Sequence, residues 1–474
     1  MSIETPFTNG LTISVQRKEF SNLISACGTV KNSTHLAVGV SGGADSMALC
    51  ILSSEWGRLN GVSVTALVVD HGLRQNSSLE AIKVSSWLKQ LKINFDILPI
   101  KKNQPITRIQ ELARTWRFSA FNQWCRANGA DTVLLGHTLE DQIETIFMRI
   151  LANTGPDGLS GIRNYTRIAG LNIARPLLSV TKKRLIATCH QYNQVWIEDP
   201  SNTDVKFTRV VLRNLQPKIE QVGLSKRHVE RYAKAMGRMR DVLDKICYDL
   251  VKGFGEVSNA GFLRLDSLRL SEIPLEIRGL LMGRILKSIG GIARPVRKKR
   301  IVKLCQDLTD RSVLKMTLGG CIIHKSENGS VLFYREYFKC APPILALTEQ
   351  LTRWDNRFEV LQVDETDGYI EKLGYHGWSQ IKMGKKVFGD LNFLLKIPFG
   401  ARLSLPMVRH LDGTLLIPHF VDNMDAGVKS GYDLPIAQFK PDEDWFCDLV
   451  FVCEDKEKID SKPSIRDGSL KKLD

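Results

Sequence analysis

The stretch that decides the fold is His35–Leu52, which reads HLAVGVSGGADSMALCIL. Its first part, His35–Val40, is short, apolar and partly β-branched, and this pattern predicts a buried strand. A polar turn, Ser41–Ser46, comes next, and an apolar helical pattern begins at Met47. The stretch therefore predicts a strand that passes through a glycine-containing turn into a helix.

The turn Ser41–Ser46, with the sequence SGGADS, has the residue types of a phosphate-binding loop. Gly42 and Gly43 allow strained backbone angles and let phosphate oxygens approach the backbone N–H groups. Those groups and the start of the following helix attract anions. Asp45 would repel a phosphate unless a cation lay between them, so it is the expected Mg²⁺ ligand. The plainer alternative is an ordinary strand-to-helix turn with a capping aspartate.

Length and composition limit the class of protein. A chain of 474 residues is too long for one ordinary core and predicts two or three domains. No apolar run approaches the roughly 18 residues that span a bilayer, so the sequence does not predict a membrane protein. The formal net charge is +15, which suits a polyanionic partner and makes nucleic acid the first candidate.

Motif searches exclude several other classes. The ten cysteines include no C-x-x-C pair, so the sequence does not support a zinc ribbon, an iron–sulfur cluster or a redox dithiol. Neither a Walker loop, G-x-x-x-x-G-K-[ST], nor a dinucleotide-binding G-x-G-x-x-G occurs. Most cysteines lie in apolar surroundings and indicate a reducing compartment.

Strand and helix patterns alternate between residues 30 and 200. The predicted strands and helices after the first unit are strands at 63–70, 94–100 and 132–135 and helices at 77–91, 107–128 and 139–151. Repeated units of this kind predict an α/β fold with a doubly wound, mostly parallel sheet and a ligand site at the strand carboxyl ends. Residues 225–251 are helical and basic, a second helical pair covers 276–308, and 312–338 has a β pattern.

The changes of helix and strand pattern along the chain predict three domains. Residues 1–215 form the predicted α/β domain, in which we expect the catalytic site, and 216–345 form a helical region, with RNA as its expected partner, whose last part is β. Residues 346–474 form a mixed domain of unassigned role that ends in a charged tail. No strong linker sequence marks either boundary.

A second polar segment, Gly136–Thr145, follows the predicted strand 132–135 and opens a helix. His137 and Asp141 are four residues apart, so they share a face near the helix start, where they could polarise a nucleotide, position Mg²⁺ or relay a proton. The alternative is that Thr138 and Asp141 only cap the helix.

Four segments in order resemble the tRNA(Ile)-lysidine synthetase family, within the PP-loop ATP pyrophosphatases. They are Ser41–Ser46, Val69–Arg74, Gly136–Thr145, and Arg175–Leu178 followed by Asp199–Asn202. The loop Gly158–Gly161 also fits, and together these segments cover about the first 215 residues. The resemblance implies that ATP is bound by Ser41, Gly42, Gly43, Ala44, Asp45 and Ser46 and is cleaved between its α- and β-phosphates.

Carried over position by position, the resemblance implies that the catalytic centre contains Asp45, Arg117, His137 and Asp141. Arg114 lies one turn from Arg117 on the predicted helix, and the sequence does not decide which of the two faces the site. The implied reaction joins free L-lysine to C2 of the wobble cytidine of a CAU-anticodon tRNA(Ile), through an adenylated cytidine, with ATP and Mg²⁺. Alternatives are a tRNA thiolase, an amidating synthetase, or an inactive RNA-binding relative.

Several arginines and lysines are expected RNA contacts. Arg209 and Arg213 match two arginines of a family segment, although Val210 stands where the family has Asn; Glu140 likewise stands where Asp is common. The remaining expected RNA contacts are Arg74, Arg297, Lys298, Lys299 and Arg300. The last four lie in a dense basic run, for which a solvated helix start or a targeting patch is the alternative.

Location and assembly are less constrained by the sequence. The length and divergence of the C-terminal half favour the mitochondrial matrix, although residues 1–20 have a poor composition for a presequence. For a bacterial source the cytoplasm is the alternative. The oligomeric state stays open, with a homodimer among the alternatives, and no lysine-binding residue is assigned.

Overall fold

The computed structural model describes residues 12–28, 30, 33–70, 77–99, 109–168, 171–198, 208–292, 294–346, 351–361, 368–383, 387–389, 391–421 and 435–441. The side chains of residues 109–115, 387 and 388 lie outside this description. The chain divides into two compact units, Met1–Asp244 and Lys245–Asp474. The boundaries expected near 215 and 345 stay predictions.

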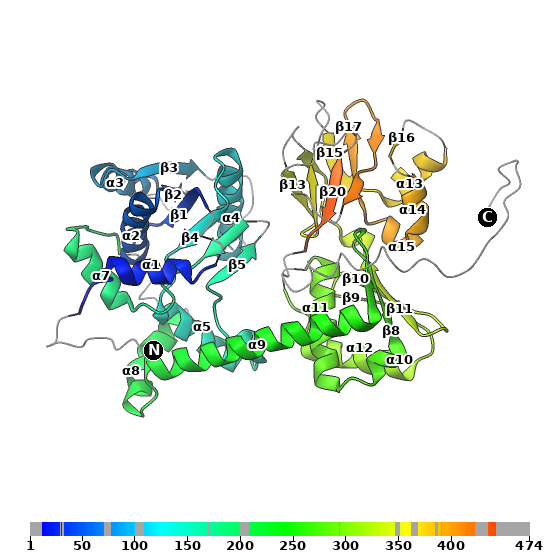
Figure 1. Ribbon diagram of the computed structural model, residues 1–474, viewed down its shortest axis with the longest axis horizontal. Coiled ribbons are helices and arrows are strands. Elements are labelled where there is room, and N and C mark those ends of the chain that lie inside the picture. Colours follow the sequence, from blue (N-terminus) through cyan, green and yellow to red (C-terminus); the bar gives the residue numbers. More distant parts are fainter. Residues whose placement is uncertain are drawn as a thin grey trace, which may run out of the picture. The chain divides into compact units, whose positions relative to one another are not determined.

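Unit 1 is an α/β unit built on one sheet (Figure 1). Its elements are α1 Arg17–Ser25, β1 His35–Val40, α2 Ala44–Asn60, β2 Ser63–Asp70, α3 Ser77–Gln90, β3 Asn94–Pro99, α4 Ile109–Ala127, β4 Thr132–Leu135, α5 Leu139–Leu151, α6 Pro156–Leu159, β5 Tyr165–Ile168, β6 Leu171–Ala174, α7 Lys182–Gln191 and α8 Thr208–Gln221. Helix α9, Lys226–Phe254, begins in unit 1 and ends in unit 2.

The sheet of unit 1 has the strand order β3-β2-β1-β4-β6-β5. All neighbouring pairs are parallel except β5 with β6, which is antiparallel. The chain therefore leaves β1 toward β2 and β3 on one side and returns to β4 on the other. Ligands of such sheets bind at the carboxyl ends of the strands where this reversal occurs, here β1 and β4. The predicted doubly wound, mostly parallel α/β fold is confirmed.

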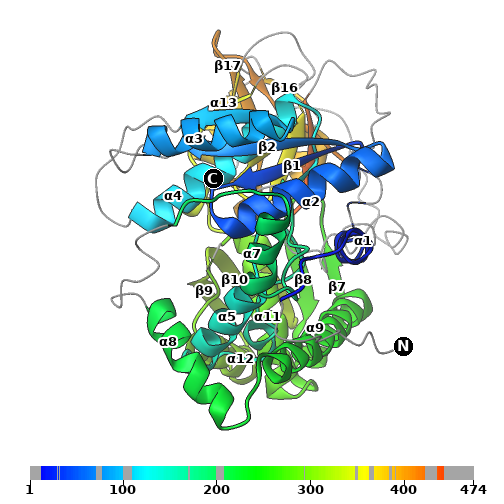
Figure 2. The same ribbon diagram turned by 90° about the vertical axis from the view of Figure 1, so that its left-hand side faces the viewer.

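Successive residues of the central strand supply two cores because side chains of a strand alternate between faces. Leu36, Val38 and Val40 pack with the apolar faces of α1, α2, α3 and α7. Ala37, from the same strand, joins a second core with Phe121 and other residues of α4. Figure 1 shows α2 and α3 on one side of the sheet and α4 on the other, and Figure 2 shows α7 next to α2.

Strands β5 and β6 were not expected from the sequence. They form a hairpin in which Thr166 pairs with Ile173, and β6 extends the sheet beyond β4. Both strands are four residues long, and β5 is half-buried throughout, so neither shows a strong apolar pattern. The other strands and helices predicted in unit 1 are confirmed, with α2 beginning at Ala44, three residues before the predicted start.

Unit 2 combines three mainly antiparallel sheets with helices around one extended core (Figure 1). Its elements after α9 are β7 Gly255–Val257, β8 Leu263–Asp266, α10 Ser267–Ser271, α11 Leu275–Gly290, α12 Lys298–Asp310, β9 Leu314–Leu318, β10 Cys321–Lys325, β11 Ser330–Arg335, η3 Tyr337–Lys339, β12 Ile344–Ala346, β13 Leu351–Trp354, β14 Phe358–Leu361, β15 Gly368–Lys372, α13 Gly374–Lys382, β16 Val387–Phe388, α14 Leu391–Lys396, α15 Phe399–Arg402, β17 Pro406–His410, β18 Leu415–Leu416, β19 His419–Val421 and β20 Ile436–Phe439.

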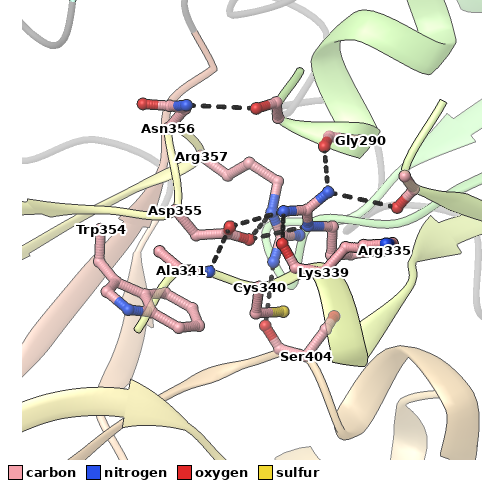
Figure 3. A network of polar contacts seen from close by, with 12 residues as sticks. Gly290, Arg335, Lys339, Cys340, Ala341, Trp354, Asp355, Asn356, Arg357 and Ser404 are labelled. Carbon is pink, nitrogen blue, oxygen red and sulfur yellow. Dashed lines mark hydrogen bonds and ion pairs between the residues drawn. The ribbon is translucent and has the colours of Figure 1, made fainter. Parts of the chain in front are cut away.

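The sheets of unit 2 are β7-β8-β11-β10-β9, β12-β15-β17-β18-β16 and β13-β14-β20-β19. A buried ion network joins β11 to the turn between β13 and β14 (Figure 3). Arg335 donates two hydrogen bonds to Asp355, at 2.8 and 3.0 Å, and Arg357 donates a third at 2.8 Å. The same carboxylate also accepts from the backbone N–H of Ala341 at 2.9 Å.

Candidate functional site

The turn between β1 and α2 requires glycine at its second position. Gly42 has a φ of +84°, a region that L side chains rarely adopt. A Cβ placed there would lie 2.7 Å from Cγ2 of Val84 and 3.0 Å from Cδ1 of Ile197. The backbone N–H of Ile197 also donates to the carbonyl of Gly42 at 2.9 Å, so the segment before residue 199 packs directly on this turn.

Ser46 holds the same turn from within. Its hydroxyl donates to the carbonyl of Gly43 at 2.9 Å and accepts from the backbone N–H of Ser41 at 3.2 Å. Gly43 is the N-cap of α2 and has no side chain to accept from the first turn of the helix. The N–H groups at the start of α2 therefore lack a side-chain cap, which is the arrangement that binds a phosphate oxygen.

The turn between β4 and α5 lies against this loop. A Cβ on Gly136 would be 3.0 Å from the carbonyl oxygen of Asp45 and 3.2 Å from the backbone nitrogen of Ser46. A side chain at this position would force the two backbones apart by a few tenths of an ångström, so glycine favours their close approach. The structure thus brings together the two segments that the sequence singled out, Ser41–Ser46 and Gly136–Thr145.

Asp45 is a buried carboxylate whose charge is only partly compensated. Burial raises its pKa from an ordinary 3.8 to about 6; Lys182 and Arg213 act to lower it, whereas Asp141 and Glu140 act to raise it. Its Oδ1 atom is buried and accepts no hydrogen bond from the residues that the structure describes. A buried anion with a free oxygen is a site that a cation or a donor from a ligand would stabilise.

Asp141 takes part in a capping box at the start of α5. Its Oδ2 accepts from the backbone N–H of Thr138 at 2.8 Å and from the Thr138 hydroxyl at 3.0 Å, while its own N–H donates to that hydroxyl at 3.4 Å. The helix-capping role considered for Thr138 and Asp141 is therefore present. The catalytic role predicted for Asp141 stays a prediction. The capped carboxylate still interacts with Asp45, because its charge acts to raise the pKa of Asp45.

Glu140, at the start of α5, contacts two other helices. One oxygen accepts from the backbone N–H of Lys182, at the start of α7, at 2.9 Å, and the other pairs with Lys226 of α9 at 2.8 Å. The longer glutamate at this position therefore reaches two partners. Nothing in the local sequence pattern pointed to Lys182 or Lys226, because both lie far from the motif in the chain.

The two arginines of α8 have different environments. Arg213 pairs with Glu144 of α5, with Nη2 2.8 Å from Oε1, and Glu144 is 3% exposed. Burial raises the pKa of Glu144, and Arg213 opposes that shift. Arg209 is exposed, and Val210 between them is buried. The apolar residue at 210 therefore faces the protein interior, and Arg213 is already engaged with an internal carboxylate.

The other predicted site residues are more dispersed. Arg117 is half-buried on α4, with its guanidinium carbon 5.8 Å from the ring centroid of Phe118. Arg74 and the side chain of Arg114 lie outside the described residues, as do His71 and Asp199. The exposed basic residues at the start of α12, in unit 2, are Arg297, Lys298, Lys299 and Arg300.

The donor set around Asp45 suits Mg²⁺ that arrives with a nucleotide. Within the described ranges, no three His, Cys, Asp or Glu side chains are grouped so that they could hold a metal by themselves. Mg²⁺ commonly keeps several waters and binds through one or two carboxylates together with substrate phosphates. The free oxygen of Asp45 beside an uncapped helix start fits that mode of binding.

The fold and the loop define the chain as a PP-loop protein that uses ATP, and a family described as a PP-loop domain matches residues 13–219. The chain belongs to the tRNA(Ile)-lysidine synthase family. It is 33% identical to the tRNA(Ile)-lysidine synthase of Methylobacterium nodulans over 61% of this chain and 87% of that protein. The enzymes of Wolbachia pipientis and Orientia tsutsugamushi are 32% and 27% identical, over 72% and 83% of this chain and 79% and 90% of theirs.

The resemblance seen in the sequence is thereby confirmed at the level of the family. These relatives are bacterial and do not support the expected mitochondrial location. Within the described ranges, no helix combines the length and the apolar character needed to cross a bilayer.

Proposed function

We propose that this chain joins the ε-amine of L-lysine to C2 of the wobble cytidine in a CAU-anticodon tRNA(Ile). As a member of the family, the chain is an ATP-dependent ligase that forms lysidine on tRNA(Ile). The order of steps, the residues that perform them and the anticodon specificity are the proposal. The observation that carries it is the close approach of Gly136 to Asp45, which places the loop and the β4–α5 turn at one point of the sheet edge.

The first step activates the cytidine. The N–H groups at the start of α2 and the hydroxyl of Ser41 bind ATP phosphates, and the O2 atom of the cytidine attacks the α-phosphate. The bond between the α-phosphate and the bridging oxygen breaks, and pyrophosphate leaves with its electron pair. Mg²⁺, when bound at Asp45, would screen the charge of the phosphates. Flipping the wobble base out of the anticodon stack costs a few kcal/mol, which basic contacts to the tRNA backbone offset.

The second step forms lysidine. The neutral ε-amine of lysine attacks C2 of the adenylated cytidine, the C2–O2 bond breaks, and AMP leaves with that oxygen. A proton is lost from the amine, and we assign its acceptance to His137, in the β4–α5 turn. Arg117 is assigned to the charge of the leaving phosphate and Asp141 to the orientation of the turn.

Substrate dependence tests the proposal. Purified protein should convert ATP to AMP and pyrophosphate only when both lysine and a CAU-anticodon tRNA(Ile) are present, and a GAU-anticodon tRNA(Ile) serves as the matched control. Formation of ADP, or equal turnover with ammonia in place of lysine, would instead indicate a different PP-loop reaction. Turnover that is indifferent to the anticodon would reject the assigned tRNA.

The tRNA contacts, the assembly and the location are proposed as well. The basic residues Arg209 and Arg297–Arg300 are assigned to the tRNA backbone, and a homodimer stays an alternative assembly. The mitochondrial matrix is a prediction that the bacterial relatives do not support, with a bacterial-type cytoplasmic location as its alternative. Fractionation of cells that express the native protein distinguishes the two locations.

A further inference from the structure

A continuous row of five aromatic side chains lies in unit 2. Its members come from η3, α13 and α15 and are, in order of contact, Phe338, Tyr337, Tyr375, Phe399 and Trp378. The ring centroids of Tyr337 lie 3.9 Å from Phe338 and 5.2 Å from Tyr375. Phe399 continues the row, 6.0 Å from Tyr375 and 6.2 Å from Trp378. We call these five residues the aromatic row.

Three members of the aromatic row are largely exposed. Phe338 is 72% exposed, Tyr375 is 55% exposed and Phe399 is 45% exposed. Trp378 is half-buried and packs against the core of unit 2, so it anchors the row. Scattered single apolar residues are normal on a surface, but contiguous large aromatic rings commonly mark a binding surface.

The row is held in place by packing and hydrogen bonds. A Cβ on Gly400 would clash with the ring of Tyr334, so the backbone of α15 lies directly on β11. The buried guanidinium of Arg402 lies 4.3 Å from the centroid of Trp378 and donates to the carbonyl of Ile397 at 2.9 Å. The end of the row formed by Phe399 and Trp378 is therefore held before any partner binds, which lowers the entropy cost of binding there.

Positive charge lies next to one end of the row. Helices α13, α14 and α15 contain no Asp or Glu and carry the exposed Lys382 and Lys396, whereas their Arg402 is buried. Lys372 lies 5.3 Å from the ring centroid of Tyr337 and donates to its carbonyl at 3.2 Å. The acidic residues on the flanking elements are Glu336, next to η3, and Glu371, whose carboxylate is already paired with Arg409 at 2.7 Å.

We propose that the aromatic row is a stacking surface for unpaired bases of the tRNA substrate, with the neighbouring lysines contacting the phosphates. Exposed rings with neighbouring positive charge are the combination that binds single-stranded nucleic acid. Paired bases hide their faces inside a duplex, so the row selects unpaired nucleotides. The proposal rests on the proposed function for the identity of the RNA, and it adds an RNA contact that does not take part in the chemistry.

Binding of a short RNA by the full chain tests the proposal without any turnover. The probe is a labelled, unstructured 12-nucleotide single strand, compared by fluorescence anisotropy with a 12-base-pair duplex. The test variant is Phe338→Ala with Tyr375→Ala. The rescue variant, Phe338→Tyr with Tyr375→Phe, keeps both rings. The control, Leu268→Ala with Leu411→Ala, removes two residues of unit 2 that are 71% and 77% exposed and lie outside the row.

The alanine pair should weaken single-strand binding by about tenfold or more, because stacking contributes about 1–3 kcal/mol per base. The rescue variant, the control and duplex binding should stay within about twofold of the native chain. With tRNA(Ile), the alanine pair should raise the KM for tRNA and leave kcat unchanged. Circular dichroism melting checks that all variants are folded.

Three results would overturn the proposal. They are unchanged single-strand affinity, an equal loss of duplex and single-strand binding, and a loss of self-association in sedimentation while RNA binding is retained, which would assign the row to a second copy of the chain. Ring-dependent single-strand binding by a protein that forms no lysidine would support the stacking surface and reject the proposed function instead. The two failures are therefore distinguishable.

Discussion

Asp45 and Asp355 are both mostly buried carboxylates, and their surroundings differ in one decisive respect. Asp355 accepts hydrogen bonds from Arg335, Arg357 and the N–H of Ala341, whereas Oδ1 of Asp45 has no partner among the described residues. Burial by itself would raise both pKa values; the arginines overcome it at Asp355 and lower that pKa, and at Asp45 burial prevails.

The two carboxylates show how one fold holds a structural charge, at Asp355, and a charge available to a ligand, at Asp45. The Asp355 carboxylate is saturated by the chain itself, as Figure 3 shows, and the side chains of its two arginine partners are 0–6% exposed. It needs no ligand and joins strands and turns of unit 2. Asp45 lacks such partners at the edge of the sheet in unit 1, and a buried charge without partners is favourable only if something else binds to it.

The largest effect on stability is expected from Asp355→Asn. The change keeps the shape of the side chain but leaves two buried arginines without their counter-charge, which costs about 3–5 kcal/mol. Urea unfolding of the full chain measures the loss. The matched control is Glu371→Gln, which breaks a half-exposed pair and should cost less than about 1 kcal/mol. Equal costs for the two variants would remove the distinction drawn for Asp355.

Asp45→Asn should have its effect on activity instead. We expect turnover of ATP to AMP to fall by about 100- to 1,000-fold, as when a group that stabilises developing charge is lost. Stability at pH 7 should not fall, because the change removes an uncompensated buried charge. The exposed Glu220→Gln serves as a control on the same unit. Near-normal turnover of the Asp45 variant would show that this carboxylate does not bind the nucleotide or its cation.

The two carboxylates should also differ in their pH dependence. Because the folded pKa of Asp45 is raised from 3.8 to about 6, its ionisation opposes folding, and the chain loses about 1–3 kcal/mol as pH rises through that window. Turnover should fall as pH drops below about 6, and Asp45→Asn should lack both features.

The contribution of Asp355 to stability changes with pH in the opposite direction. Its lowered pKa means that its stabilising contribution is present above its ordinary value of 3.8 and is lost as pH falls through the still lower folded pKa. Stability measured in Asp45→Asn and in Asp355→Asn as a function of pH separates the two contributions. A native pH profile that is flat between 4 and 7, for both stability and turnover, would contradict the assignment made for Asp45.

The smallest effects concern the two arginines of α8. Arg213→Gln should cost about 1–3 kcal/mol of stability, because it leaves the buried Glu144 without its partner. Arg209→Gln should change stability by no more than about 0.5 kcal/mol, and should weaken tRNA binding with a salt slope smaller by about 0.7–0.9. Salt-dependent binding and unfolding assays measure both, and a reversed pattern would exchange the roles of the two residues.

The sequence predicted most of the fold of unit 1 and the two segments of the site. A buried strand, a glycine turn and a helix follow one another locally in His35–Leu52, so their pattern is legible in the chain itself. The hairpin β5–β6 was missed because its short strands lack a strong apolar alternation. The contacts of Glu140 with Lys182 and Lys226 were missed because they join residues 42 and 86 positions apart.

By itself, the sequence determined the class of the loop, the kind of sheet and the family that its motifs resemble, because these depend on residue types at short spacing. Only the tertiary structure decided which charges are saturated. Asp45 and Asp355 are the same residue type, and the number of donors that the fold brings to each carboxylate sets its pKa and its freedom to bind a ligand. That number depends on packing between elements distant in the chain.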